Sequence, residues 1–312
     1  MDIFLRSISG ILVILGMILV GFVIGEKGWF DDKSRGLIAK LVTQVALPCY
    51  MLYTITQRFT AADLLKMLPA LRFPALSMVV LLGIATAVAK IFAVRQDRRG
   101  LFISMFFNSN TIFVGLPINQ ALFGDDSIPY VLIYYMCNTT FFWTLGTYLI
   151  QRDGEGEAQF DLKTSVKKVF SPPLMGFILG LVMVMLQIKL PAFLASDLQY
   201  LGNLTTPLSM IFIGLSVSHV GVKQLVLGKD QLLILLGRFV VAPLLMATIV
   251  YWASLPSLMK QVFIIQSAMP VMTNAPVVAR LYGADSDYAA VMVTETTLAT
   301  MVVIPILMVL MA

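Results

Sequence analysis

The sequence predicts an all-α membrane protein with ten transmembrane helices, arranged as two inverted five-helix repeats in which helices 4 and 9 are broken and cross. Three observations support this fold class. Of the 312 residues, 59% are hydrophobic and only 12% are charged, whereas soluble domains carry about 25% charged residues. The apolar residues fall in long runs, and the two halves share a pattern. This composition excludes a soluble globular protein, a disordered chain and a nucleic-acid binder.

Ten apolar runs are long enough to cross a bilayer, whose core of about 30 Å needs about 20 residues of helix. In chain order, the predicted spans are 3–25, 34–57, 72–94, 100–122, 128–150, 172–188, 194–217, 231–254, 259–282 and 288–311. The first and third are the plainest, because Ile8–Ile24 and Phe73–Val94 contain almost no polar groups. The fourth and ninth are the least apolar.

The lysines and arginines predict the orientation. The loops after spans 1, 3, 5, 7 and 9 hold sixteen of the 22 basic residues, counting Lys40 and Arg238, which fall inside spans. The basic side is cytoplasmic by the positive-inside rule, so both termini face outside the inner membrane. Lys40 and Arg238 either attract an anion or snorkel to the surface, and snorkelling is favoured for Lys40.

An offset of 159 residues aligns the two halves. It pairs Gly21 with Gly180, Pro48 with Pro207, Pro117 with Pro276, Gly124 with Gly283 and Asp126 with Asp285. We therefore predict a first repeat over 1–150, a cytoplasmic linker over 151–170 and a second repeat over 171–312. Five spans per repeat is an odd number, so the second repeat inserts upside down. Inverted repeats with interrupted helices are typical of secondary transporters.

Spans 4 and 9 carry polar residues and prolines at mid-depth, namely Asn108, Asn110, Thr111, Pro117, Thr273, Asn274 and Pro276. Proline lacks an N–H and clashes with the preceding turn, so Pro117 and Pro276 should interrupt their helices, and Pro270 adds a second break. The freed carbonyls of Asn110–Gly115 and Met269–Asn274 could coordinate a cation or a proton donor. The following half-helices begin with partial positive charge, which suits a carboxylate. Two facing breaks would form a crossing with the substrate site at its centre.

Other polar residues within spans have two interpretations each. Glu295 in span 10 is a candidate proton carrier or a structural partner of an arginine. The threonines beside it, Thr294, Thr296 and Thr297, complete a cation site or bond to their own helix. Gln44 precedes Pro48 and is a candidate for lining the cavity. Asn138, Thr139 and Thr140 are interpreted as contacts between helices, and Arg95, Arg98 and Arg99 as a topology anchor.

The segment Asn108–Pro117, the Ala46–Pro48 stretch, Asn274–Pro276 and the Tyr282–Gly283 pair resemble the auxin efflux carrier family in its bacterial branch. The resemblance covers essentially the whole chain. It implies a scaffold domain from spans 1, 2, 6 and 7 and a transport domain from spans 3–5 and 8–10, similar to bile acid–sodium symporters. The crossing prolines map to Pro117 and Pro276, and the crossing asparagine to Asn110 or Asn108. The large central loop of the plant carriers is absent.

The resemblance also implies transport of a small organic anion, such as malate, malonate or indole-3-acetate. A proton or sodium ion is a possible coupling ion, and no other cofactor is expected. The alternative function is a sodium/proton antiporter, for which Glu295 would be the only mid-span acid. An enzyme is not expected, because the sequence lacks HExxH, GxSxG and paired intramembrane aspartates. The scaffold spans could form a homodimer face.

Overall fold

The structure is a computed structural model that describes residues 2–154, 170–220 and 228–311. These residues are helical, contain no β-strand and include one isolated β-bridge. Five helices are long and apolar enough to cross a membrane: Lys33–Arg58, Ala61–Ile91, Ala192–His219, Lys229–Tyr251 and Ser286–Met311. The all-helical, membrane-protein class is therefore confirmed, and the count of ten spans stays a prediction.

The described chain divides into two compact units. The first comprises Met1–Val13, Leu71–Val166 and Val220–Ala312, and the second comprises Ile14–Ala70 and Lys167–His219. Helix α1 (Asp2–Glu26) begins in the first unit and continues into the second. Each unit therefore gathers segments from both halves of the sequence.

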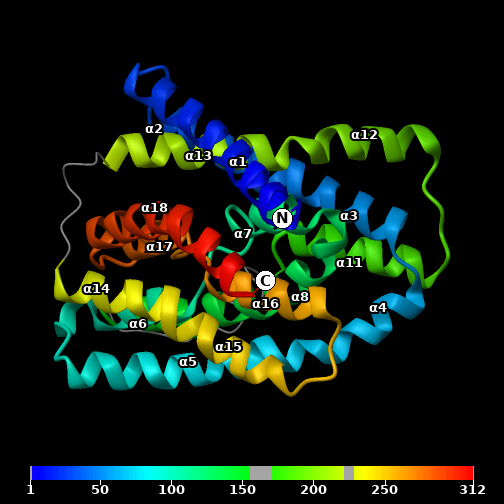
Figure 1. Cartoon of the computed structure of the whole chain (residues 1–312). Helices are drawn as coiled ribbons and strands as arrows, with labels where there is room; N and C mark the ends of the chain where they lie inside the picture. The colour runs from blue at the N-terminus through cyan, green and yellow to red at the C-terminus, as the bar shows by residue number, and fades with distance from the viewer. Residues whose placement is uncertain (1, 155–169, 221–227, 312) are drawn as a thin grey trace. The chain divides into compact units, whose positions relative to one another are not determined.

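The second unit contains helices from both of its chain segments. In chain order, they are the later part of α1, α2 (Asp32–Leu41), α3 (Leu47–Arg58), α4 (Ala61–Met67), α11 (Pro172–Met185), α12 (Ala192–Asn203) and α13 (Thr205–Val220). A π-helical turn, Val42–Ala46, joins α2 to α3 just before Pro48, and a break at Leu204 separates α12 from α13 just before Pro207. Figure 1 shows α3 beside α11, with which it is in extensive contact.

Small residues let the helices of this unit approach closely. A Cβ added at Gly21 in α1 would lie 2.3 Å from the Ile211 carbonyl oxygen of α13. The residues related by the 159-residue offset make the matching contact, because a Cβ at Gly180 in α11 would lie 3.6 Å from Leu52 Cα of α3. The two close approaches thus involve residues that are 159 positions apart in the sequence.

Gly21→Ala is expected to lower the stability of the protein by about 2 kcal/mol, the usual range for overpacking against backbone that cannot move. Gly16→Ala is the matched control on the same helix, because a Cβ at Gly16 meets nothing within 4 Å. Thermal unfolding in detergent measures both. Equal midpoints for the two variants would show that α1 and α13 can separate without cost.

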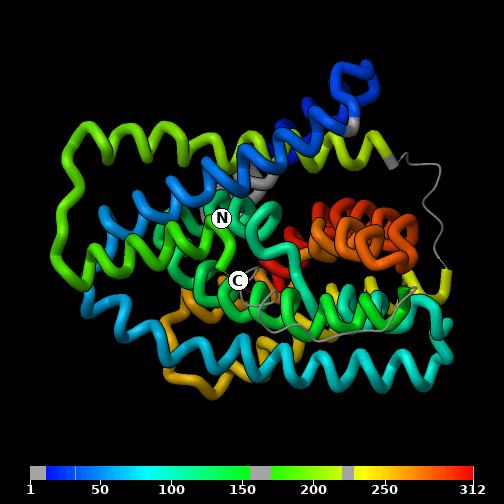
Figure 2. Tube along the Cα trace, turned by 180° about the vertical axis from the view of Figure 1, so that it is seen from behind, coloured from blue at the N-terminus to red at the C-terminus, as the bar shows by residue number. Residues whose placement is uncertain are grey.

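The first unit holds the remaining described α-helices. In chain order, they are α5 (Arg72–Ile91), α6 (Arg99–Phe107), α7 (Gly115–Phe123), α8 (Ile128–Phe141), α9 (Thr147–Gln151), α14 (Lys229–Leu236), α15 (Ala242–Tyr251), α16 (Ser257–Ser267), α17 (Ala275–Leu281) and α18 (Ser286–Met311). Two π-helical turns, Phe142–Gly146 and Gly237–Val241, interrupt the α8–α9 and α14–α15 runs. In Figures 1 and 2, α5 runs beside α15, and α17 packs on α18.

Candidate functional site

Two helices of the first unit are interrupted in mid-course. Residues 108–114 separate α6 from α7, and residues 268–274 separate α16 from α17. Both predicted interruptions are therefore present. Pro117 and Pro276 lie in the first turns of α7 and α17, where a missing N–H costs nothing, because these positions have no partner within the helix. Pro270 lies inside the second break.

The two breaks pair with each other. Ser109 and Val271 form an antiparallel β-bridge, and the Asn110 N–H donates to the Pro270 carbonyl at 2.8 Å. Thr296 Oγ1 of α18 accepts from the Val271 N–H at 3.0 Å. Backbone outside a helix is tolerated at membrane depth only where it is satisfied by protein or lines a cavity. Each break thus supplies backbone hydrogen-bond partners for the other.

Asn110 lies at the centre of this pairing and is 3% exposed. Its Oδ1 accepts from the Phe113 N–H at 3.2 Å, and its carbonyl accepts from the Gly115 N–H at 3.0 Å, which shapes the turn into α7. Its Nδ2 group has no acceptor among the described residues. The side chain therefore presents a buried N–H donor that a carboxylate oxygen could accept from.

Asn108, the other candidate for the crossing asparagine, is also buried but is directed back along its own helix. Its Nδ2 donates to the Ser104 carbonyl at 3.1 Å, and it lies against Gly146, where an added Cβ would be 2.9 Å from Nδ2. The geometry therefore separates the two asparagines: Asn108 bonds to its own helix, and Asn110 lies in the paired backbone.

Asn138 of α8 holds the first break in place. Its Oδ1 accepts from the Ser109 N–H at 2.7 Å, and its Nδ2 donates to the Ser109 carbonyl at 2.8 Å. The sequence suggested a contact between helices for Asn138, and the structure shows that it satisfies both backbone groups of one residue. Thr140, in contrast, donates to the Met136 carbonyl of its own helix.

The second break is more open than the first. Thr273 and Asn274 are partly exposed, as is Pro276, whereas Thr111 in the first break is buried. Asn274 stands at the N-terminal cap of α17 without a side-chain hydrogen bond to the helix. The polar side chains of the second break are thus more exposed to solvent than Thr111 of the first.

The structure adds Gln266 and Asn119, which sequence analysis did not single out. Gln266 is fully buried in the last turn of α16, and its Nε2 donates to the Thr111 carbonyl at 3.2 Å. A Cβ at Gly115 would lie 2.2 Å from Gln266 Oε1, so a larger residue there would displace the Gln266 amide. Asn119 Nδ2 donates to the Gly115 carbonyl at 2.7 Å. An amide inside an apolar span was the available signal for both.

Arg238 also lies at the breaks. It is fully buried, and its guanidinium donates to carbonyls of both interrupted helices, including that of Met269. Burial therefore excludes snorkelling for Arg238, because a snorkelling side chain would reach the surface. The Met269 carbonyl, expected as a possible cation ligand, accepts from this arginine.

Glu295 is 6% exposed and lies in α18 beside Thr296, the residue that binds the second break. The neighbouring threonines bond to their own helix: Thr294 donates to the Ala290 carbonyl and Thr297 to the Val293 carbonyl. The buried acid thus belongs to the helix that supports the second break. Gln44 and Lys40 belong to the second unit, where both are exposed.

Asp153, which follows α9, fixes the start of the first half-helix. Its two carboxylate oxygens accept from the Gly100 N–H at 2.9 Å and the Leu101 N–H at 2.6 Å. These N–H groups have no partner within α6, so a distant side chain supplies the cap. Burial raises the pKa of the Asp153 carboxyl, and the two N–H donors only partly oppose this rise.

This raised pKa predicts how stability depends on pH. A carboxyl whose pKa is higher in the folded than in the unfolded state stabilises the fold most below its unfolded pKa. The stabilisation from Asp153 therefore falls as the pH rises from 3.8, the ordinary pKa of an aspartate, through the raised pKa of the folded state. We expect the melting temperature of the wild type relative to Asp153→Asn to decline from about pH 4 to neutral. If the melting temperature of the wild type relative to Asp153→Asn instead rose with pH, the Gly100 and Leu101 N–H donors would outweigh burial in setting the Asp153 pKa.

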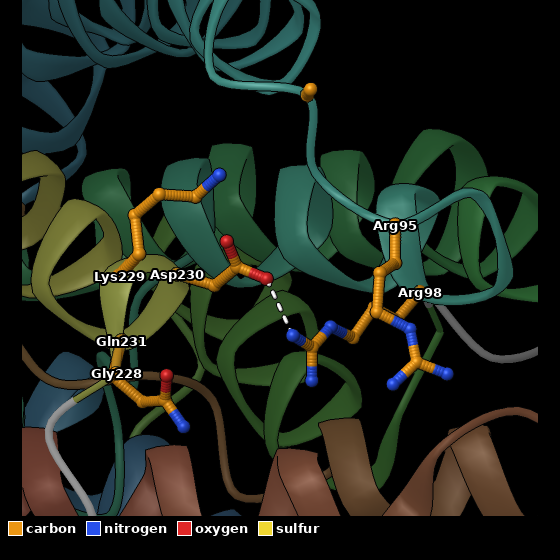
Figure 3. Close-up of a pocket in the computed structure, with 7 residues that line it drawn as sticks. Arg95, Arg98, Gly228, Lys229, Asp230 and Gln231 are labelled. Atoms are coloured by element: carbon orange, nitrogen blue, oxygen red, sulfur yellow. Dashed lines mark hydrogen bonds and ion pairs between the residues drawn. The ribbon is translucent and has the colours of Figure 1, made fainter.

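A separate hollow of about 360 Å³ lies where the loop after α5 meets the start of α14. Figure 3 shows Arg98 reaching Asp230, an ion pair of 2.6 Å. Arg95 pairs with Asp97, and Lys229 donates to the Phe92 carbonyl at 2.5 Å. These basic groups are thus engaged with the protein, and the hollow is distinct from the paired breaks.

Comparison with known proteins identifies the class. A family model described as "Membrane transport protein" matches residues 7–308. The chain is 27% identical over 299 residues to an uncharacterized transporter of Methanocaldococcus jannaschii, covering 94% of this chain and 95% of that protein. It is 26% identical over 312 residues to an uncharacterized transporter of Methanothermobacter thermautotrophicus, covering 97% and 98%. The chain belongs to this membrane transport family, the auxin efflux carrier family.

Proposed function

We propose that this protein is a secondary transporter that moves a small organic anion by alternating access around the two paired breaks. The observation that carries the proposal is the pairing of two interrupted helices at Ser109 and Val271, in a chain of a membrane transport family. Interrupted helices at mid-depth are where secondary transporters bind substrates and ions.

The proposed architecture is ten spans in two inverted repeats. The matching contacts of Gly21 and Gly180 support a repeat in the second unit. In this proposal, the second unit is the scaffold and could form a homodimer face, and the first is the transport domain. The protein would lie in the inner membrane with both termini outside and the linker 151–170, largely outside the described residues, in the cytoplasm.

The proposed anion site lies between the two breaks of the first unit. The free N–H of the Asn110 side chain and the N-terminal end of α7, which begins at Gly115, would bind a carboxylate. Thr111, Thr273 and Asn274 would contact the remainder of the substrate. Asn108, Pro117 and Pro276 would act by shaping the breaks.

Coupling to an ion is proposed through Glu295, because it is a buried acid on the helix that supports the second break. A buried carboxyl can carry a proton across the membrane when access alternates. Transport driven by the substrate gradient alone would need no such coupling.

Uptake into proteoliposomes tests the proposal. Labelled malate, malonate and indole-3-acetate are offered to the purified protein, with and without a sodium or proton gradient. We expect saturable uptake of at least one anion above that of empty vesicles. Folded protein that transports none of them contradicts the proposal. Proton release on addition of sodium, without an organic substrate, would favour a sodium/proton antiporter.

A further inference from the structure

Arg238 is a fully buried cation that contacts both interrupted helices. It belongs to the π-helical turn Gly237–Val241 between α14 and α15. Nε donates to the Met269 carbonyl at 3.0 Å, Nη1 to the Phe106 carbonyl at 3.1 Å, and Nη2 to Ser109 Oγ at 2.5 Å, the Ser267 carbonyl at 2.6 Å and the Met269 carbonyl at 2.9 Å.

The acceptors lie where the first half of each broken helix ends. Phe106 is in the last turn of α6, and Ser267 is the last residue of α16. Helix C-termini carry unsatisfied carbonyls and partial negative charge. One guanidinium therefore caps two half-helices that are far apart in sequence.

Arg238 has no acidic partner among the described residues. All its hydrogen-bond acceptors are neutral carbonyl or hydroxyl oxygens, and no acid among the described residues lies within ion-pair distance. Buried charges within a membrane protein are normally paired, and they mark the routes of substrates and ions. Carbonyl dipoles stabilise the guanidinium without cancelling its charge, so the site keeps a net positive field.

The chain makes room for this arginine. A Cβ at Gly237 would lie 2.3 Å from Cε2 of the buried Phe106 ring, so glycine lets the turn approach α6. Single π-helical turns inside α-helices are frequent at functional sites. Gly237 thus allows the close approach that places the guanidinium of the next residue, Arg238, against α6.

We infer that Arg238 determines substrate charge: it is a fixed cation whose field selects an anion over its neutral analogue in the adjacent site at Asn110. The inference rests on the proposed function. Ser109, which Arg238 contacts, directly precedes Asn110 in the chain. Because each of the three guanidinium nitrogens already donates to a protein oxygen, Arg238 acts mainly through its field in a medium of low dielectric constant.

The experiment compares each acid with its carboxamide. Equilibrium binding of malate, malonate and indole-3-acetate, and competition by the corresponding amides, is measured on purified wild type, Arg238→Gln and Arg238→Lys. Arg98→Gln is the matched control, because it removes an arginine of the same unit that is paired with Asp230. Binding is used because a variant that cannot move can still bind.

We expect the wild type and Arg98→Gln to prefer the acid strongly. Arg238→Gln should lose at least about tenfold of this preference, which is about 1.4 kcal/mol, chiefly by weaker binding of the acid. Arg238→Lys should keep most of it, because the charge remains. A purely structural role would weaken acid and amide alike.

Two results would overturn the inference. The first is an unchanged preference for the acid in folded Arg238→Gln. The second needs no variant: a wild type that binds acid and amide within about threefold of each other, less than about 0.7 kcal/mol, has no charge selection to explain. Both results differ from failure of the proposed function, in which the wild type binds none of the acids.

Discussion

Asn110→Ala is expected to reduce anion uptake at least tenfold, while the protein still folds and reaches the membrane. The change removes the buried Nδ2 donor that has no acceptor among the described residues. It also removes the acceptor for the Phe113 N–H, so the entry into α7 loses a hydrogen bond. A site that loses a hydrogen bond to a charged group typically loses about 1.5–3 kcal/mol, which corresponds to a tenfold effect or more.

Initial rates of uptake in proteoliposomes measure this effect, with protein amount and melting temperature determined for each variant. Asn203→Ala is the control for the same chemical change, because Asn203 is exposed in the second unit. Asn108→Ala should lose less than Asn110→Ala, because Asn108 bonds to its own helix. Uptake by Asn110→Ala at the wild-type rate would remove Asn110 from the site.

Gly100→Ala is expected to cause a larger loss of stability than Gly21→Ala. A Cβ at Gly100 would lie 1.9 Å from the Leu149 carbonyl oxygen and 3.1 Å from Asp153 Oδ1. The first contact is with backbone, so α6 must move away from α9, and the cap from Asp153 must shift. Overpacking of this kind costs about 3 kcal/mol, which would lower the melting temperature by at least about 5 °C.

Gly83→Ala is the matched control in the same unit. Gly83 lies in α5, is exposed and has nothing within 4 Å of an added Cβ. Alanine is favoured over glycine inside a helix by about 0.5–1 kcal/mol, so this variant should melt at or above the wild-type temperature. Equal melting temperatures for Gly100→Ala and the wild type would mean that α6 and α9 are not tightly packed in the membrane.

The sequence predicted the features that depend on local chemistry. Polar residues and a proline within an apolar span indicate an interruption, because proline cannot complete the helix and free backbone needs partners. Both breaks lie where they were predicted from Asn110, Pro117, Asn274 and Pro276. The irregular turns just before Pro48 and Pro207, inside the predicted spans 34–57 and 194–217, were not predicted. The family also followed from the residues of the first break.

The sequence could not predict which groups satisfy the breaks. Asn138 and Gln266 are single amides in apolar spans, and nothing local shows that one holds Ser109 and the other Thr111. These partners are 29 and 155 residues apart in the chain. Choosing between Asn108 and Asn110 likewise required side-chain directions, which change by about 100° with each residue of a helix and are irregular in a break.

By itself, then, the sequence determined the helical membrane class, the places where two helices stop and restart, and the family. Hydropathy and proline chemistry act within a few residues, so they can be recognised along the chain. Only the tertiary structure decided that one break pairs with the other and that Arg238, rather than solvent or a lipid headgroup, meets the carbonyls at both helix ends. The physical reason is that a buried polar group must be satisfied by whatever the packing brings within about 3 Å.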